Sequence, residues 1–376
     1  MSELSPLQRA WVEVSPAAIE SNARTLLGHL KPGTQLMAVV KADGYGHGAV
    51  TVAKAALRGG ASSLGVATLQ EGLELRAAGI NAPILLLSAL HSADELTRCH
   101  EHGLMPTLSS LEEASLCDRI SAERGGEPFP VQLKVDTGMS RLGADWRVGA
   151  ELVQSIRALP NLQLVGLYSH LACADIEGEA TTRLQHDRLN AVINALPDQG
   201  RDLCCHLANS AGTLHGHELH LDMVRVGLAL YGQRPARHLG AELRLQPALA
   251  VRARVSLIRD VPAGTGVSYG HRYITPGGSR LAVVAIGYAD GVIRALSGRI
   301  HALHRGSPLP QVGAITMDQI VLDASDHSDL RIGDTVTLLG RDGEASIEPQ
   351  EWAHQCDSIT WEILCGFRKR LPRVEV

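Results

Sequence analysis

The sequence predicts an α/β protein with two domains, a (β/α)8 barrel of the TIM type followed by a domain made mainly of β-strands. Short apolar segments alternate with amphipathic helical segments over the first two thirds of the chain. Near residues 235–240 this alternation stops, and strand-like segments separated by Gly, Pro and Asp follow. The 376 residues are also too many for one ordinary core. We expect the barrel in residues 11–240 and the β domain in residues 241–376, with residues 1–14 as candidates to pack with the latter.

The barrel strands are predicted from short apolar runs, several of them β-branched, bounded by polar residues or glycine. A first strand is expected at residues 11–14, and Ser15-Pro16 then predicts a helix start, because serine caps helices and proline suits their first turn. Eight barrel strands are expected at residues 37–40, 63–66, 84–87, 105–107, 131–135, 165–168, 203–207 and 223–226. Helices are expected between them, for example at residues 68–78, 93–102 and 110–122. Eight such units in roughly 200–250 residues favour a closed barrel over an open doubly wound sheet.

The second domain is predicted from a change of period. Residues 249–257 alternate apolar and polar side chains, which is typical of a strand with one buried face. Further strands are expected at residues 281–286, 319–322 and 335–339, separated by turn residues.

The composition excludes several classes of protein. Hydrophobic residues make up 45% and charged residues 20%, as in soluble globular proteins, and the net charge of −5 gives no electrostatic footprint for nucleic acid or anionic membrane. No apolar run approaches the ~20 residues that cross a bilayer, and residues 1–6 lack a secretory pattern. The seven cysteines are odd in number and form no C-x-x-C pair, which argues against a disulfide framework or a zinc site. We therefore expect a cytoplasmic protein without a metal.

The stretch from residue 39 to residue 48 combines a buried strand end, a lysine and glycines. Lys41 ends the first barrel strand, where partial desolvation disfavours its charged form. A neutral amine is what Schiff-base chemistry with a carbonyl requires, and the glycines at 44, 46 and 48 allow the backbone to approach a ligand. The alternative is an ordinary strand-ending lysine followed by a glycine turn.

Other polar residues are expected at the same rim, since barrel active sites lie at the C-terminal ends of the strands. Arg141 follows strand five, His170 ends strand six, Ser210 follows strand seven, and Arg225 lies in strand eight. Barrels commonly bind phosphate with the loops after strands seven and eight, and a phosphate pocket facing a Schiff-base lysine indicates pyridoxal phosphate. The alternative for each residue alone is a paired structural ion or a core histidine.

These segments resemble the alanine racemase family, two-domain enzymes of fold type III that use pyridoxal 5'-phosphate. Residues 39–48 resemble the family's cofactor-lysine signature. Supporting similarity lies at residues 134–143, 169–172, 206–211, 224–232, 264–270, 287–291 and 317–319. The resemblance implies an isomerase that interconverts L-alanine and D-alanine by two-base proton transfer. It also implies a homodimer with shared active sites, and a role in supplying D-alanine as a peptidoglycan precursor.

The resemblance also implies catalytic roles. Lys41 would hold the cofactor and act as the base on one face of the substrate, and Tyr269 of the partner subunit would act on the other. Arg141 would contact the phenolic oxygen of the cofactor and the substrate carboxylate. Arg225 would face the pyridine nitrogen with His170 behind it. For Tyr269, the residues alone favour a turn tyrosine that packs within the β domain, and only the resemblance favours the base.

The remaining roles concern binding. The resemblance implies that the phosphate group and its surroundings are held by Tyr45, Asn209, Ser210, Gly227 and Leu228. Met317 of the partner would bind the substrate carboxylate through its backbone amide, and Tyr288 would line the corridor to the site. Lys134 matches a lysine that is often carbamylated in the family, the alternative being an ion pair with Asp136. At Trp361 the sequence departs from the family, where a tyrosine hydroxyl often contacts the phosphate.

Three other functions stay open on the residues. The first is racemisation of other or broader small amino acids, such as serine. The second is a non-catalytic pyridoxal phosphate carrier, which would lack the second domain and Tyr269. The third is a fold type III decarboxylase, which would need a partner cysteine and aspartate in the β domain, and the sequence near Cys356 and Cys365 shows no such pair.

Overall fold

The computed structural model describes residues 8–90 and 92–376. By its internal contacts the chain forms two compact units. One, here called the barrel unit, comprises residues 17–44 and 49–246. The other, the β unit, comprises the described residues up to Pro16, residues 45–48 and residues 247–376. Of the N-terminal stretch expected to pack with the β domain, residues 1–7 lie outside the described residues.

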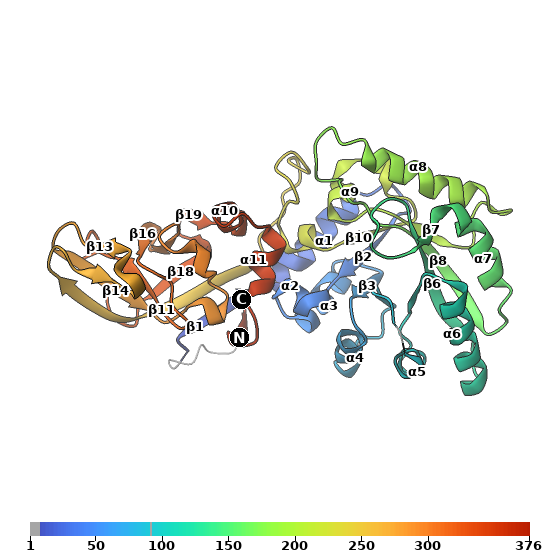
Figure 1. Ribbon diagram of the computed structural model, residues 1–376, viewed down its shortest axis with the longest axis horizontal. Coiled ribbons are helices and arrows are strands. Elements are labelled where there is room, and N and C mark those ends of the chain that lie inside the picture. Colours follow the sequence, from blue (N-terminus) through green and yellow to red (C-terminus); the bar gives the residue numbers. More distant parts are fainter. Residues whose placement is uncertain (1–7, 91) are drawn as a thin grey trace. The chain divides into compact units, whose positions relative to one another are not determined.

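The barrel unit is a ring of parallel strands with helices around it (Figure 1). Its strands are β2 (Gln35–Val39), β3 (Ser63–Val66), β4 (Ile84–Leu86), β5 (Thr107–Leu108), β6 (Phe129–Asp136), β7 (Ala144–Asp145), β8 (Leu162–Tyr168), β9 (Cys204–His206) and β10 (Met223–Val226). They pair in the order β4-β3-β2-β10-β9-β8-β6-β5, and a parallel bridge between Leu85 and Met105 joins the two ends. The short β7 pairs only with β6. This confirms the predicted barrel.

Helices connect the barrel strands, and four of those described, α4, α5, α6 and α9, begin at side-chain caps. They are α1 (Pro16–His29), α2 (Lys41–Tyr45), α3 (Ala49–Arg58), α4 (Leu69–Ala77), α5 (Ala93–Glu101), α6 (Leu111–Arg124), α7 (Gly149–Arg157), α8 (Thr181–Asn194) and α9 (Ser210–His215). Short 3-10 turns lie at Trp146–Val148, His217–Leu219 and Leu228–Tyr231. Thr68, Ser92 and Ser110 each accept the amide N–H of the residue three positions later, which satisfies a donor that the first helical turn leaves open.

The β unit is built around one long strand. Its strands are β1 (Ala10–Val14), β11 (Leu249–Val261), β12 (Gly266–Val267), β13 (Tyr273–Ile274), β14 (Ser279–Val284), β15 (His301–His304), β16 (Ser307–Val312), β17 (Ile320–Asp323), β18 (Thr335–Asp342), β19 (Ala345–Ile347) and β20 (Arg373–Glu375). The main sheet runs β19-β18-β15-β16-β17-β14-β11-β1-β20, and β11 also pairs with β18. β11 thus pairs with three strands, β1, β14 and β18, and register shifts at Val251/Arg252 and Val255/Leu257 mark where its pairing is irregular.

Smaller elements complete the β unit (Figure 1). They are helices α10 (Pro349–Gln355) and α11 (Thr360–Gly366), and the 3-10 turns Tyr269–His271, Tyr288–Asp290 and Arg294–Leu296. The all-β second domain expected from the sequence is thereby confirmed, with two short helices added near its end. All seven cysteines are free thiols. Within the residues that the structure describes, no helix is both long enough and apolar enough to cross a membrane.

Candidate active site

The chain takes an unusual backbone conformation immediately after Lys41. Residues 42–45 all have positive φ: 53° at Ala42, 54° at Asp43, 60° at Gly44 and 51° at Tyr45. The turn labelled α2 is therefore left-handed, which costs roughly 1–2 kcal/mol for each residue that carries a Cβ. Strain of this size persists only where surrounding contacts hold it, and it is concentrated at functional sites.

Three hydrogen bonds hold this turn within the barrel unit. The Ala42 amide donates to Oε1 of Glu71 at 2.7 Å, and the Gly44 amide donates to the Val40 carbonyl at 2.9 Å. Oδ1 of Asp43 accepts the Ala49 amide at 3.0 Å. The carboxylate of Glu71 also caps its own helix α4, so the strained turn is fixed to a helix end.

The residues that follow the turn are held in the β unit. Arg373 Nε donates to the Gly46 carbonyl at 3.0 Å. A Cβ on Gly46 would lie 2.5 Å from the Leu364 carbonyl oxygen, so only glycine fits at this place. Tyr45 is buried, and burial, with a smaller effect of Cys365, raises the pKa of its hydroxyl. The lysine segment is thus anchored on both sides of its left-handed turn.

Arg225 on β10 is the most completely enclosed charge of the barrel unit's site, with 3% of its surface exposed. Its Nη2 donates to the carbonyls of Ser169 at 2.7 Å and Leu207 at 3.0 Å, and lies 3.1 Å from Nδ1 of His170. Its Nη1 lies 2.8 Å from Nδ1 of His206. Burial lowers the pKa of the guanidinium to about 10.

These contacts fix the protonation of both histidines. A guanidinium only donates, so Nδ1 of His170 and of His206 must each present a lone pair. The proton of His206 is then on Nε2, which donates to Oε1 of Gln132 at 2.8 Å. Burial, and after it the charge of Arg225, lowers the pKa of both imidazoles well below its usual value. Both rings are therefore neutral bases locked in one tautomer.

Tyr168 at the end of β8 forms a platform beneath these groups. Its ring stacks on His206, with centroids 4.7 Å apart and planes 3° from parallel. Arg225 and Lys134 both lie over the same ring, at 5.0 Å and 5.5 Å from its centroid. Its hydroxyl lies 2.7 Å from Oγ1 of Thr107, which itself donates to the Leu86 carbonyl.

Lys134 on β6 is buried, and its charged form is disfavoured. Burial, and after it the charges of Arg225, Arg141 and Lys41 in that order, lower the pKa of its amine to about 8. The sequence left open an ion pair with Asp136. In the structure, Oδ1 of Asp136 instead accepts the backbone amides of residues 138, 139 and 140 at 2.8–3.1 Å and shapes the loop that carries Arg141.

Four cationic side chains thus act on one another at the C-terminal rim of the barrel: Lys41, Lys134, Arg141 and Arg225. The structure brings these predicted residues together, along with His170. Such a set is stabilised by an anionic ligand, because neighbouring like charges raise the free energy of one another's charged forms.

Backbone amides converge next to this cluster. Oγ of Ser210 accepts the amide N–H of Gly227 at 3.0 Å and of Ala229 at 3.3 Å. Leu228 is buried between these two residues at the start of a 3-10 turn. Oδ1 of Asn209 accepts the Gly212 amide at 3.0 Å and so caps α9, which fixes where Ser210 lies. Converging amide donors and a hydroxyl form a suitable cradle for a phosphate group.

The β unit presents the other predicted residues on its surface. Tyr269 lies in the hairpin between β12 and β13 and is 74% exposed, while Tyr288 is 42% and Met317 52% exposed. Tyr288 N–H donates to the Thr316 carbonyl at 2.9 Å, which places Tyr288 beside Met317. Oγ of Ser268 donates to the Ala314 carbonyl at 2.7 Å and ties the Tyr269 hairpin to the same loop. Trp361 is half-buried in α11.

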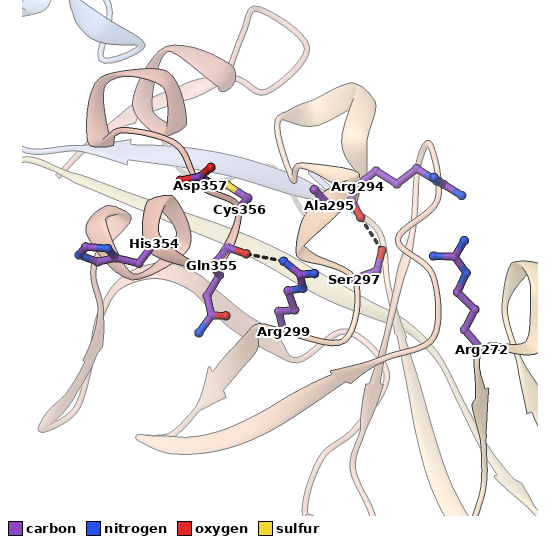
Figure 2. A pocket seen from close by; sticks show the side chains of 9 residues that line it. All are labelled: Arg272, Arg294, Ala295, Ser297, Arg299, His354, Gln355, Cys356 and Asp357. Carbon is purple, nitrogen blue, oxygen red and sulfur yellow. Dashed lines mark hydrogen bonds between the residues drawn. The ribbon is translucent and has the colours of Figure 1, made fainter.

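A cationic hollow of about 550 Å³ in the β unit is separate from these residues. Figure 2 shows its lining, in which Arg299 donates to the Gln355 carbonyl at 2.7 Å. Arg272, Arg294 and His354 also line it, and its lining includes none of the predicted site residues.

The sequence did not single out Gln132 and Tyr168 for the site, and it placed His206 at the same rim, with a core histidine as the alternative, but gave it no role. One signal existed for Gln132: it lies two residues before Lys134 in an otherwise apolar strand, so both side chains point to the same face. Tyr168 and His206 lie at strand ends, but their stacking joins β8 and β9 and has no signature within either segment.

Two family models match the chain. Residues 14–235 match the model described as "Alanine racemase, N-terminal domain", and residues 248–375 match the one described as "Alanine racemase, C-terminal domain".

Known proteins resemble the chain over its whole length. The alanine racemase of Prochlorococcus marinus is 55% identical over 380 residues, covering 100% of this chain and 98% of that protein. The crystal structure of alanine racemase from D-cycloserine-producing Streptomyces lavendulae has a TM-score of 0.91 at 38% identity, covering 98% of this chain and 97% of that one. The structure of the Bartonella henselae alanine racemase with covalently bound pyridoxal phosphate has a TM-score of 0.87 at 32% identity, covering 98% and 99%.

The two locked histidines predict how stability depends on pH. Their folded-state pKa lies below the unfolded value of about 6.5, so the unfolded chain binds more protons and stability falls as pH drops below that value. Each histidine contributes a slope of up to roughly 1.4 kcal/mol per pH unit.

The variant His206→Gln tests this prediction. The side-chain amide oxygen of glutamine can still accept a hydrogen bond from Arg225, but the amide does not take up a proton as the pH falls. We expect calorimetric melting curves between about pH 5 and 8 to show a shallower loss of stability for this variant than for wild type. Equal slopes would mean that His206 binds its proton equally well in the folded and unfolded chain, so that its pKa is not lowered.

Proposed function

The chain belongs to the alanine racemase family, and we propose that it interconverts L-alanine and D-alanine through a pyridoxal phosphate site assembled from the residues described above. The observation that supports this most strongly is the group of four cations at the C-terminal rim of the barrel. A cofactor that carries a phosphate and a phenolic oxygen, together with a substrate carboxylate, would supply the negative charge that this group requires.

The donor set fits the cofactor. Lys41 supplies the amine that would hold its aldehyde carbon, and Ser210 with the amides of Gly227 and Leu228 would hold its phosphate. Asn209 would support this cradle by capping α9, and Tyr45 would add a hydroxyl. Pyridoxal phosphate, when bound, withdraws electrons from the α-carbon of the amino acid, so that its proton can be removed.

Arg225 would determine how strongly the bound ring withdraws electrons. Its four short contacts hold the guanidinium in place, and the neutral His170 and His206 accept from it without competing for its charge. An arginine facing the pyridine nitrogen cannot take up a proton and cannot stabilise a protonated ring as a carboxylate would. Charge would therefore remain nearer the α-carbon, which favours returning the proton there over side reactions such as transamination.

Proton transfer would use two bases on opposite faces of the substrate. Lys41 would serve one face and Tyr269 the other, so the substrate need not turn over between removal and return of the proton. Unperturbed lysine and tyrosine have pKa values of about 10.4 and 10, and nearby cations favour the neutral amine and the phenolate. Arg141 and the Met317 amide would hold the carboxylate, and Tyr288 would line the approach.

The exposure of Tyr269, Tyr288 and Met317 on the β unit supports a shared site. We infer that they complete the active site of a second copy of the chain, so that a homodimer contains two mixed sites. In the cell, the D-alanine formed in the cytoplasm would serve as a precursor of bacterial peptidoglycan.

The activity is tested by proton exchange in heavy water. Purified protein with pyridoxal phosphate is supplied with L-alanine or L-serine, and each D-enantiomer is followed with time. We expect deuterated D-alanine to form quickly, with little D-serine. Cofactor absorbance without exchange would contradict the racemase and support a carrier.

The shared site is tested by mixing two inactive variants. Lys41→Ala and Tyr269→Phe are each expected to lose nearly all racemase activity, and only Tyr269→Phe should keep its bound cofactor. When the two variants are co-expressed with different tags, random pairing makes about half of the dimers mixed. Each mixed dimer has one intact site out of two, so about one quarter of wild-type activity should return. No recovery in isolated mixed dimers would show that both bases come from one chain.

Lys134 is the site of a proposed modification. Its pKa of about 8 leaves some neutral amine near neutral pH. The amine nitrogen would form an N–C bond with carbon dioxide while one C=O bond opens to the carboxylate, and the released N–H proton would go to water. The carbamate would place a negative charge among the site's cations, beside Arg141. We expect a ¹³C carbamate signal after incubation with labelled bicarbonate, and no such signal in Lys134→Gln. A spectrum that is the same for both proteins would refute the modification.

A further inference from the structure

Two histidines and an aspartate meet in the β unit, outside the predicted active site. One ligand atom each of His304, His327 and Asp329 lies within 4.8 Å of the other two. We propose that these three residues bind a divalent transition metal of the zinc class, with water in the fourth position, and that the metal fastens the loop before β18 to the hairpin β15–β16.

The backbone brings these residues together from two places in the chain. His304 ends β15 and is followed by a two-residue turn, Arg305 and Gly306, whose φ angles of 52° and 80° suit a tight hairpin. His327 and Asp329 lie in the loop between β17 and β18. Turn hydrogen bonds shape that loop, the His327 amide donating to Ala324 at 2.9 Å and the Leu330 amide to His327 at 3.2 Å.

In each histidine, a contact of Nε2 leaves Nδ1 as the nitrogen available to a metal. Nε2 of His327 lies 3.1 Å from the Pro308 carbonyl, which can only accept, so the ring proton is on Nε2 and Nδ1 carries a lone pair. Nε2 of His304 faces Oδ2 of Asp334 at 3.5 Å, which favours the same tautomer. Metal-bound histidines commonly direct their second nitrogen to a carbonyl or carboxylate in this way.

Asp329 supplies the third ligand. Its Oδ2 accepts from Arg305 at 2.9 Å, and the carboxylate has a second oxygen to offer a cation. Two imidazole nitrogens and one carboxylate, completed by water, form a ligand set typical of zinc.

Only a small movement is needed to close the site. Bonds of about 2.0–2.1 Å in a tetrahedron place ligand atoms roughly 3.3 Å apart, so the three donors must draw together. His304 is 4% exposed and fixed in a strand, while His327 is half-buried and Asp329 exposed. The loop side chains can therefore move toward a fixed His304, and binding would order the loop.

A second group of histidines shows why geometry alone is not enough. The rings of His29, His217 and His220 in the barrel unit lie 5.0–6.0 Å apart. However, Nδ1 of His220 accepts the Lys31 amide at 3.2 Å, and its Nε2 donates to the Thr213 carbonyl at 2.9 Å. With both ring nitrogens engaged by the backbone, His220 cannot ligate without losing a hydrogen bond.

The proposal is tested on untagged holoenzyme freed of metal with a chelator and dialysed after addition of Zn²⁺ or Co²⁺. We expect one metal ion per chain to remain, and Co²⁺ to give visible bands of tetrahedral nitrogen and oxygen coordination without a thiolate charge-transfer band. Zn²⁺ should also raise the melting temperature of the β unit by mass action.

Three variants locate the site. His327→Ala and Asp329→Asn should lose the retained metal and the rise in melting temperature while racemising alanine normally. His301→Ala removes a histidine from the same strand, β15, and should behave as wild type. The proposal is overturned if wild type retains no metal after dialysis, or if His327→Ala and Asp329→Asn retain as much as His301→Ala does.

Discussion

The buried guanidinium of Arg225 is the charge on which the rest of the barrel site depends. Removing such a group from water is costly, and its four short contacts offset that cost only if each partner accepts. Two of the four are histidine nitrogens, so neither ring can be protonated on that side. His206 must then carry its proton on Nε2, which donates to Gln132. The ring of Tyr168 stacks on His206, so the position of one ring constrains the other. One cation therefore sets the tautomers and ring positions of side chains from three strands.

A second constraint lies in the backbone beside Lys41. The left-handed turn over residues 42–45 is unfavourable for the side chains that it carries, and the structure holds it with Glu71 and Asp43 on one side and with Arg373 and α11 on the other. In the role proposed for Lys41, a flexible backbone at this place would have to be ordered in every catalytic cycle. Fixing the backbone in advance leaves only the side chain to move, which is the advantage of preorganised positioning.

Much of this architecture could be predicted from the sequence, because it depends on local signals. The eight barrel strands follow from apolar runs, and the C-terminal rim then groups Lys41, Arg141, His170 and Arg225 without further information. The left-handed turn could not be predicted, since Ala42 and Asp43 seldom adopt positive φ and their conformation is imposed by distant partners. The role of Asp136 as a loop cap, and the meeting of His304 with residues more than twenty positions away, likewise depend on tertiary contacts.

The placement of residues 45–48 has a consequence for engineering. These four residues belong by their contacts to the β unit, although they lie inside the barrel unit's stretch of sequence. If the chain were divided near residue 247, the C-terminal part would keep Arg373 and α11 but lose the Gly46 backbone that contacts both. Chimaeras between relatives would have to transfer this tetrapeptide, along with the N-terminal strand β1, whenever the β unit is exchanged. The two units are thus not interchangeable modules, and recombination within the family is constrained to respect a boundary that the linear sequence does not reveal.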